Sequence, residues 1–165
     1  MFRLQSKTVT GTNQLTLADA KVWLRVDGTD EDDLITSLID ESRGLIESYL
    51  DISMVETTIV LLVSARYKLD PPYLPVVTVT SLKDADDVDV DYTWDGFFVT
   101  TTSFENYTIT YTAGYAVLPV GLMLGWKQVL ALMYENRGDD ITQNYESLIM
   151  QNENLIPYRN AVWFG

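Results

Sequence analysis

Residues 15–35, with the sequence LTLADAKVWLRVDGTDEDDLI, decide the fold because they predict where one helix begins and ends and where the next one starts. Thr16 followed by Asp19 is typical of a helix start, since a threonine hydroxyl and an acidic side chain three positions on can satisfy the free N–H groups of the first turn. The pair Asp27-Gly28 is typical of a turn, so this helix is predicted to end at about Val26.

A second helix is predicted directly after the turn, with Thr29 or Asp30 as its cap. Its first turn is acidic, which the positive end of the helix dipole favours. Apolar side chains then recur at helical spacing in one wide stripe, which comprises Leu34, Ile35, Leu38, Ile39, Leu45, Ile46 and Tyr49. We therefore expect a long amphipathic helix that reaches about residue 50.

The middle of the chain changes character, because residues 55–112 are rich in Val, Thr, Tyr and Ile and are broken by Pro, Asp and Gly. This composition predicts strands, and the Asp95-Gly96 pair predicts a hairpin between two of them. The predicted strands are residues 57–64, 76–82, 92–94, 97–101 and 107–112, with a proline-rich crossing at 67–75. Together they predict a small antiparallel sheet inserted between helices.

Helical character returns after Pro119, a residue that suits the first turn of a helix. The helix is predicted to end near Asn136-Arg137-Gly138, and the polar residues 139–154 predict a loop. Gly125 lies inside the helix at a cost of about 1 kcal/mol, which indicates either close packing at this point or a later helix start. The tail, residues 155–165, is apolar and aromatic again.

The predicted fold class is therefore α+β. Two N-terminal helices in residues 1–54 and a long C-terminal helix with its tail in residues 117–165 are expected to pack as one domain, a helical bundle. Residues 55–116 form the β-rich insertion.

Composition excludes several functions. The chain of 165 residues carries 24 acidic and 11 basic side chains, a formal net charge of −13, and has no histidine and no cysteine. Nucleic-acid affinity comes mainly from cations, so a basic binding patch is not expected. Without histidine or cysteine, the chain cannot by itself build a Ser-His-Asp or Cys-His mechanism. We expect a soluble intracellular protein without catalytic residues, cofactor or membrane segment, because no apolar stretch is long enough to span a bilayer.

The acidic stretch Asp84–Asp91 allows a second hypothesis, a calcium-dependent binding module. Alternation along a strand would place Asp87, Asp89 and Asp91 on one face, as weak candidates for a hard-cation site. The simpler interpretation is a solvated strand edge that resists aggregation. A hydrolase that uses paired carboxylates is a third hypothesis, but acidic residues are too frequent here to single out one pair.

The C-terminal segment supplies candidate interface residues, namely Tyr158, Arg159, Trp163 and Phe164. Aromatic and arginine side chains are enriched at interface hot spots, so this segment can anchor a neighbouring subunit or partner. The alternative is that Trp163 and Phe164 fold back onto the core of their own chain. Both interpretations stay open at this stage.

Three ordered motifs resemble the tailed-phage head–tail connector (adaptor) proteins. The first is residues 15–27 with the acidic helix start at 30–35, the second is residues 127–137 with their Tyr134-Glu135-Asn136-Arg137 end, and the third is Leu155–Arg159. The strand ending at Tyr111–Tyr115, just before the last helix, is similar to the longer subgroup that carries a β insertion. Tyr134 and Arg137 thereby join the candidate interface residues.

The resemblance implies a structural virion protein, made in the bacterial host cytoplasm and located at the head–tail interface of a phage, prophage or gene-transfer particle. Copies of the chain are expected to form a ring, usually dodecameric, between the portal protein and a stopper or tail-completion protein. Helix faces would build the ring, while the C-terminal segment and loops would make the axial contacts. DNA would pass through the ring without specific binding.

Overall fold

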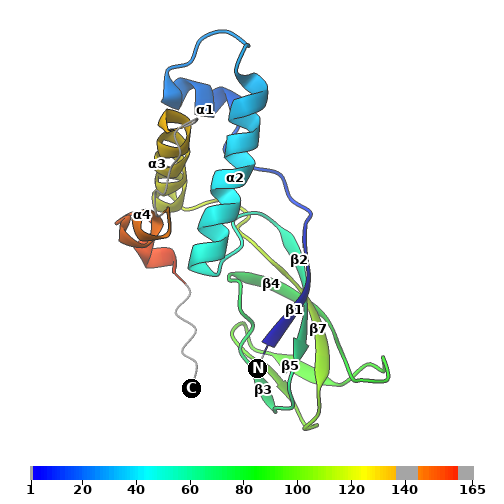
Figure 1. The fold of residues 1–165 in the computed structure, drawn as a ribbon. Coiled ribbons are helices and arrows are strands. Elements are labelled where there is room, and N and C mark those ends of the chain that lie inside the picture. The colour runs from blue at the N-terminus through cyan, green and yellow to red at the C-terminus, as the bar shows by residue number, and fades with distance from the viewer. Residues whose placement is uncertain (1, 137–144, 160–165) are drawn as a thin grey trace. The chain divides into compact units, whose positions relative to one another are not determined.

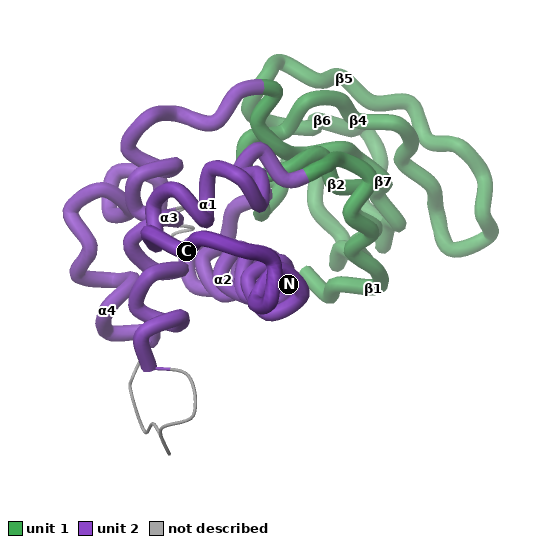
Figure 2. Tube along the Cα trace, turned by 90° about the horizontal axis from the view of Figure 1, so that it is seen from above, with its two compact units in different colours: residues 1–12, 55–116 green, residues 13–54, 117–165 purple. Residues whose placement is uncertain are grey.

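The computed structural model describes residues 2–136 and 145–159 (Figure 1). The chain divides into two compact units, coloured separately in Figure 2. Unit 1 comprises Met1–Thr12 and Val55–Ala116, and unit 2 comprises Asn13–Met54 and Val117–Gly165. Unit 1 holds all the strands and unit 2 holds all the helices of the described residues, so the protein is of the predicted α+β class.

The first two helices of unit 2 are α1 (Leu17–Leu24) and α2 (Asp32–Leu50). Thr16 caps α1 as predicted, because its hydroxyl oxygen accepts a hydrogen bond from the Asp19 backbone N–H at 3.1 Å. Helix α1 ends slightly earlier than expected, at Arg25, whose φ of 57° is left-handed. The predicted caps of α2 were wrong: Glu31 occupies the cap position without a side-chain bond, and Lys21 pairs with Asp32 at 2.5 Å.

Unit 2 continues with α3 (Val120–Glu135), α4 (Tyr145–Gln151) and a 3-10 turn, η1 (Ile156–Tyr158). The buried stripe of α2 packs against α3, with Trp126 as the largest fully buried side chain. The core of this unit includes Ala20, Ile35, Ile39, Ile46, Leu50, Leu122, Trp126, Val129, Leu130, Ile149 and Leu155. Of the predicted apolar stripe, Ile35, Leu38, Ile39 and Ile46 are buried, whereas Leu34 is exposed, so the buried face is narrower than predicted.

Helix α4 corrects the expectation of a polar loop over residues 139–154. Its sequence, YESLIMQ, is mostly polar or half-exposed, but Ile149 is fully buried. One apolar anchor is enough to hold two turns of helix against a neighbour, because most helix stability in proteins comes from packing. The remaining residues of the expected loop that precede Tyr145 lie outside the described part of the chain.

Unit 1 contains two antiparallel sheets where one small sheet was expected. The first has the order β1 (Phe2–Val9), β2 (Thr57–Val63), β7 (Tyr107–Ala113) and β4 (Val76–Lys83). The second has the order β3 (Lys68–Leu69), β6 (Val99–Thr101) and β5 (Tyr92–Trp94). Strands β2 and β7 alternate strictly between buried and half-buried residues, so one face of the larger sheet forms the core of this unit.

Strand β1 corrects the expected boundary of the helical part, which had included every residue from 1 to 54. Residues 2–9 pair antiparallel with β2, from Phe2 opposite Val63 to Val9 opposite Thr57. Without β1, one side of β2 would present unpaired backbone groups, so the N-terminal strand completes the sheet. The register shifts between Leu4 and Ser6, which breaks the alternation that would mark a strand in the sequence.

The predicted hairpin is present between β5 and β6. Asp95 Oδ1 accepts hydrogen bonds from the backbone N–H groups of Phe97 at 2.8 Å and Phe98 at 2.7 Å, and Gly96 has a φ of 95°. These two bonds stabilise the ionised carboxylate and lower the pKa of Asp95 below its ordinary value. The turn chemistry read from Asp95-Gly96 is therefore the chemistry that closes the hairpin.

Candidate assembly surface

The C-terminal segment of unit 2 lies against α3, where two glycines make room for it. A Cβ atom built on Gly125 would lie 2.4 Å from Leu155 Cδ2, and one built on Gly121 would lie 3.1 Å from the Tyr158 hydroxyl. The side-chain amides of Asn152 and Asn154 add hydrogen bonds to Gln128 Oε1 at 2.9 and 3.2 Å. Gly125 thus marks close packing inside a continuous helix, and not a later helix start.

An exposed patch surrounds this docked segment and includes two of the predicted interface residues. We call it the C-terminal patch and define it as Val120, Ile156, Tyr158 and Arg159. Val120 is 86% exposed and Ile156 is 49% exposed, while Tyr158 is half-buried against Gly121 and Arg159 is exposed. Apolar, tyrosine and arginine side chains side by side on a surface are typical of protein–protein interfaces.

The sequence analysis did not single out Val120 or Gly121. The available signal was the pair Gly121 and Gly125, which are four residues apart and so lie on one face of a helix. Such spacing indicates that another segment approaches that face closely. The predicted tail residues Trp163 and Phe164 lie outside the described residues.

The side chain of Tyr134 makes a contact within its own chain. Its hydroxyl donates a hydrogen bond to Glu31 Oε2, which joins the end of α3 to the start of α2. The ring is half-buried, so one side of it still reaches the surface. Its partner in the sequence motif, Arg137, lies outside the described residues, and the interface role of both stays a prediction.

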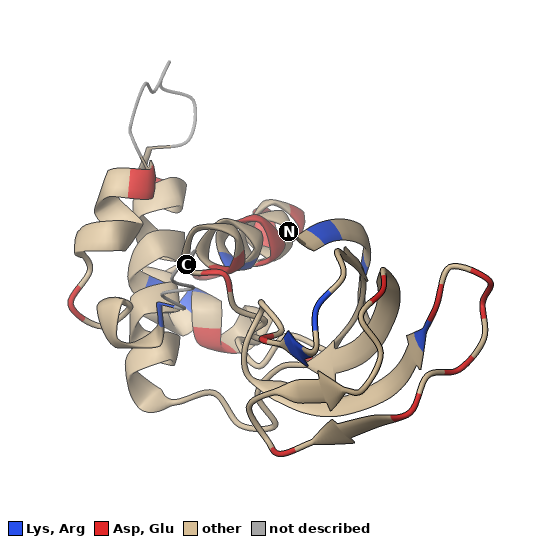
Figure 3. Ribbon diagram, turned by 90° about the horizontal axis from the view of Figure 1, so that it is seen from below, with Lys and Arg blue, Asp and Glu red and all other residues tan. Residues whose placement is uncertain are grey.

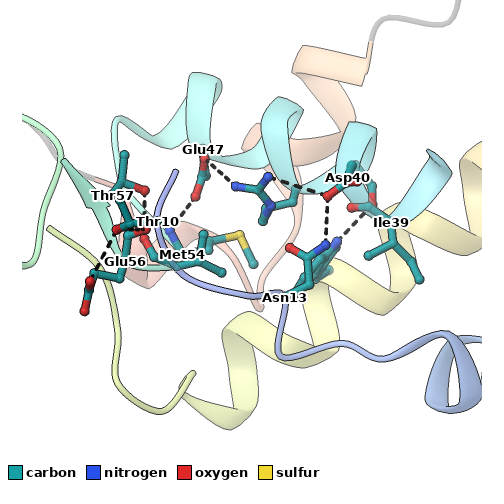
Figure 4. A network of polar contacts seen from close by, with 12 residues as sticks. Thr10, Asn13, Ile39, Asp40, Glu47, Met54, Glu56 and Thr57 are labelled. Atoms are coloured by element: carbon teal, nitrogen blue, oxygen red, sulfur yellow. Dashed lines mark hydrogen bonds and ion pairs between the residues drawn. The ribbon is translucent and has the colours of Figure 1, made fainter. Parts of the chain in front are cut away.

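A polar network holds the middle and the C-terminal part of α2 in unit 2 (Figure 4). At the C-terminal end, Glu47 Oε1 accepts a hydrogen bond from the Met54 backbone N–H at 2.7 Å, and Glu47 Oε2 lies 3.4 Å from Arg43 Nη1. Further along the helix, Asn13 Nδ2 donates to Asp40 Oδ1 at 2.8 Å. Glu47 is only 3% exposed, and because it has a cationic partner and a backbone donor it is a structural group and not a catalytic acid.

The candidate calcium ligands do not form a site. Asp87 pairs with Lys83 at 3.0 Å, and this contact raises the pKa of Lys83. The backbone of Asp89 pairs with that of Lys83, while Asp84 Oδ1 accepts bonds from the N–H groups of Asp86 and Val88. Across residues 2–136 and 145–159, acidic residues nowhere gather in a group of three that could hold a metal ion. The aspartates of this loop are red in Figure 3. The hydrogen bonds named above lie within the loop and close it.

The same described ranges contain no helix with the length and apolar character needed to cross a bilayer.

A family model described as "Phage gp6-like head-tail connector protein" matches residues 14–81. The predicted resemblance to head–tail connectors is confirmed. The match begins just before the capped start of α1 and runs through α2 into β4, so it includes the first of the three motifs. The matched family is one of connector proteins and not of enzymes, in agreement with the residue types that the chain lacks.

Solved structures of similar fold come from the necks of phage-like particles. A chain in the neck of an empty gene transfer agent (GTA) particle, computed with C6 symmetry, has a TM-score of 0.76 and 20% identity, and the match covers 100% of this chain and 98% of that one. A chain of the native GTA virion gives a TM-score of 0.73 at 20% identity, also over 100% and 98%. A chain in the native GTA neck, computed with C12 symmetry, gives 0.67 at 17% identity, over 96% and 98%.

These matches show that the chain shares the fold of GTA neck chains, including the β unit that the family model covers only in part. A comparison with curated protein sequences finds no significant match.

Proposed function

We propose that this chain is a structural subunit of the head–tail connector, or adaptor, of a phage, prophage or gene-transfer particle. The observation that carries the proposal is the end-to-end structural match to a neck chain, which covers 100% of this chain and 98% of that chain. Both units of the protein have their counterparts in that one chain. Its place would then be the neck of the virion, after synthesis in the cytoplasm of the bacterial host.

Copies of the chain assemble into a ring, which we propose to be dodecameric. Support comes from the similar structures, which are GTA particle necks computed with C6 or C12 symmetry. Closed rings need a surface on each copy that differs from the surface it meets on the next. In this proposal the helix faces of unit 2 build the ring.

The ring binds the portal protein on one side and a stopper or tail-completion protein on the other. The C-terminal patch is our candidate for one of these axial contacts, since Val120 and Ile156 expose apolar surface next to Arg159. DNA passes through the channel without specific binding. With a net charge of −13 on each copy, a ring carries on the order of a hundred negative charges, which discourages DNA from adhering.

Co-expression with the portal protein of the same particle tests the proposal. The two proteins should co-purify, light scattering should give a mass of the ring on the portal, and electron micrographs should show rotational symmetry. A chain that remains a monomer and never joins a portal contradicts the proposal. A monomer in isolation is compatible with it, because many assembly proteins oligomerise only on their partner.

Matched variants test the C-terminal patch in the same assay. Val120→Asp and Arg159→Glu should each weaken portal or stopper binding at least tenfold. Val77→Asp is the control, since Val77 is 58% exposed on β4 and lies outside both the patch and the helices of unit 2. Equal effects of Val77→Asp and Val120→Asp would show that the patch has no special role.

A further inference from the structure

Strand β1 is an open sheet edge with a positive charge. It lies at the end of the order β1-β2-β7-β4 and pairs, within the described residues, with β2 alone. Its residues Arg3 to Ser6 are all exposed, and Leu4 is 44% exposed. Residues 1–16 contain Arg3 and Lys7 but no acidic residue, although the whole chain carries a net charge of −13. A long exposed edge of this kind favours pairing with another chain.

The opposite edge of the same sheet carries negative charge. Strand β4 leads into the loop 84–91, which holds five aspartates and an exposed valine, Val88, at 58% exposure. The loop is preorganised, because Asp84 Oδ1 accepts backbone bonds from Asp86 and Val88, and the Val90 N–H donates to Leu82 O at 2.8 Å. Figure 3 shows these aspartates in red beyond the end of β4.

The two edges cannot neutralise each other within one copy, because three strand spacings, roughly 14 Å, separate them. The exposed side chains of Arg3, Asp86 and Asp89 are therefore available to other molecules. Two complementary surfaces on opposite sides of one subunit make a head-to-tail contact, the kind that closes into a ring.

We propose that the β1 edge of one copy binds the acidic loop 84–91 of a second copy. The guanidinium of Arg3 binds the carboxylates of Asp86 and Asp89, and Leu4 covers Val88. Arginine suits this role because its planar group can form paired bonds to a carboxylate. The inference rests on the proposed ring. It adds contacts between neighbouring copies of unit 1 to the helix contacts made by unit 2. It gives the β insertion a role in assembly.

Paramagnetic labelling of the full chain tests this contact directly. The chain has no cysteine, so Gln5→Cys on β1 accepts a single nitroxide label. Mixed with an unlabelled copy enriched in nitrogen-15, the labelled copy should broaden the amide signals of residues 84–91 in its neighbour. Added salt should weaken the effect, since ions screen exposed charges. The method detects weak association and needs no portal.

Charge exchange supplies the controls. Asp86→Lys with Asp89→Lys in the isotope-enriched copy should abolish the broadening, and Arg3→Glu in the nitroxide copy should restore it. Asp30→Lys with Asp33→Lys changes the net charge equally, on exposed residues outside the loop, and should leave the broadening intact. Broadening confined to other residues, or none at the highest soluble concentration, overturns the inference.

The outcome is separable from that of the proposed function. If the amides of the loop are unaffected but the chain still forms rings on the portal, only the contact between β1 and the loop is wrong. If the chain joins no portal, the connector assignment fails irrespective of the labelling result.

Discussion

Leu155 packs so closely on Gly125 that a Cβ atom on this glycine would lie 2.4 Å from Leu155 Cδ2 and 2.6 Å from Leu155 Cγ. Both residues are fully buried, since Leu155 is 0% exposed and Gly125 lies on the buried face of α3. The contact joins the third of the connector motifs to α3, the helix that carries most of the second. It gives a physical reason for a poor helix former in the middle of the helix.

Gly125→Ala should lower the free energy of unfolding by up to about 2 kcal/mol, because the overlap costs about 1–3 kcal/mol against a helix-propensity gain of about 1 kcal/mol. Gly44→Ala is the matched control, since a Cβ on Gly44, in the interior of α2, meets nothing within 4 Å. That control should stabilise the protein by up to about 1 kcal/mol. Urea unfolding measures both, and equal shifts in the same direction would rule out the close-packing explanation.

Ser42→Ala should destabilise unit 2 by about 1–3 kcal/mol, because it leaves a buried donor without a partner. The Trp126 indole N–H donates to Ser42 Oγ at 2.9 Å, and both residues are 0% exposed. Ser48→Ala on the exposed side of the same helix is the control and should change stability little. A double-mutant cycle with Trp126→Phe should show coupling between the two positions; additive effects would contradict the role of the bond.

Glu47→Ala should cost about 3–5 kcal/mol, because it leaves Arg43 without its buried partner and removes the acceptor for the Met54 N–H. Glu47→Gln should cost less, since its carbonyl oxygen can still accept that bond. Glu41→Gln, exposed on the same helix, should fall within about 0.5 kcal/mol of the wild type. Thermal and urea unfolding rank the three variants, and an order with Gln more damaging than Ala at position 47 would refute this account.

Stability should fall as the pH rises above about 10, in part because of Tyr111. Burial raises the pKa of its hydroxyl above the ordinary value of 10.0, with a smaller contribution from Tyr73. A raised folded pKa gives stability that is fully present below the unfolded pKa and is lost as the unfolded chain ionises above it. The hydroxyl also donates to Pro72 O, so Tyr111→Phe should cost about 1 kcal/mol at neutral pH.

The stability difference between Tyr111→Phe and the wild type should shrink as the pH is raised past 10, because the variant has no hydroxyl to ionise at this position. Tyr67→Phe is the control, since Tyr67 is 55% exposed and should show no such convergence. Unfolding curves collected across alkaline pH measure both. Parallel curves for Tyr111→Phe and the wild type would contradict the linkage.

Elements with local chemical signals were predictable from the sequence. Thr16 and Asp19 are three residues apart, and Asp95 bonds to residues two and three positions later, so each signal lies within one turn of the chain. The apolar stripe of α2 was equally clear, because seven apolar residues repeat with the period of an α-helix. The order of these signals also carried the resemblance to the connector family.

Elements that depend on distant partners were not predictable. Strand β1 forms because its backbone hydrogen-bonds to β2, which lies some fifty residues later in the sequence. Its irregular register hides the alternation of inward and outward side chains that is typical of a strand. Helix α4 depends on the burial of Ile149, which the sequence around this residue does not predict. Tyr134 was assigned to an interface, whereas its bond to Glu31 spans 103 positions in the sequence. The C-terminal patch was found only in part for the same reason, since Gly121 of α3 and Tyr158 meet only after folding.

Each unit is built from two separate stretches of sequence, and this affects how the chain folds while it is synthesised on the ribosome. The apolar face of α2 is synthesised before residues 55–116, and its partner α3 follows only after them. At about 5–20 residues per second, this delay lasts roughly 3–12 seconds. During that interval Ile35, Ile39 and Ile46 lack their native cover. We therefore expect the nascent chain to bind chaperones that recognise apolar helices, so that its yield depends on them as well as on its final stability.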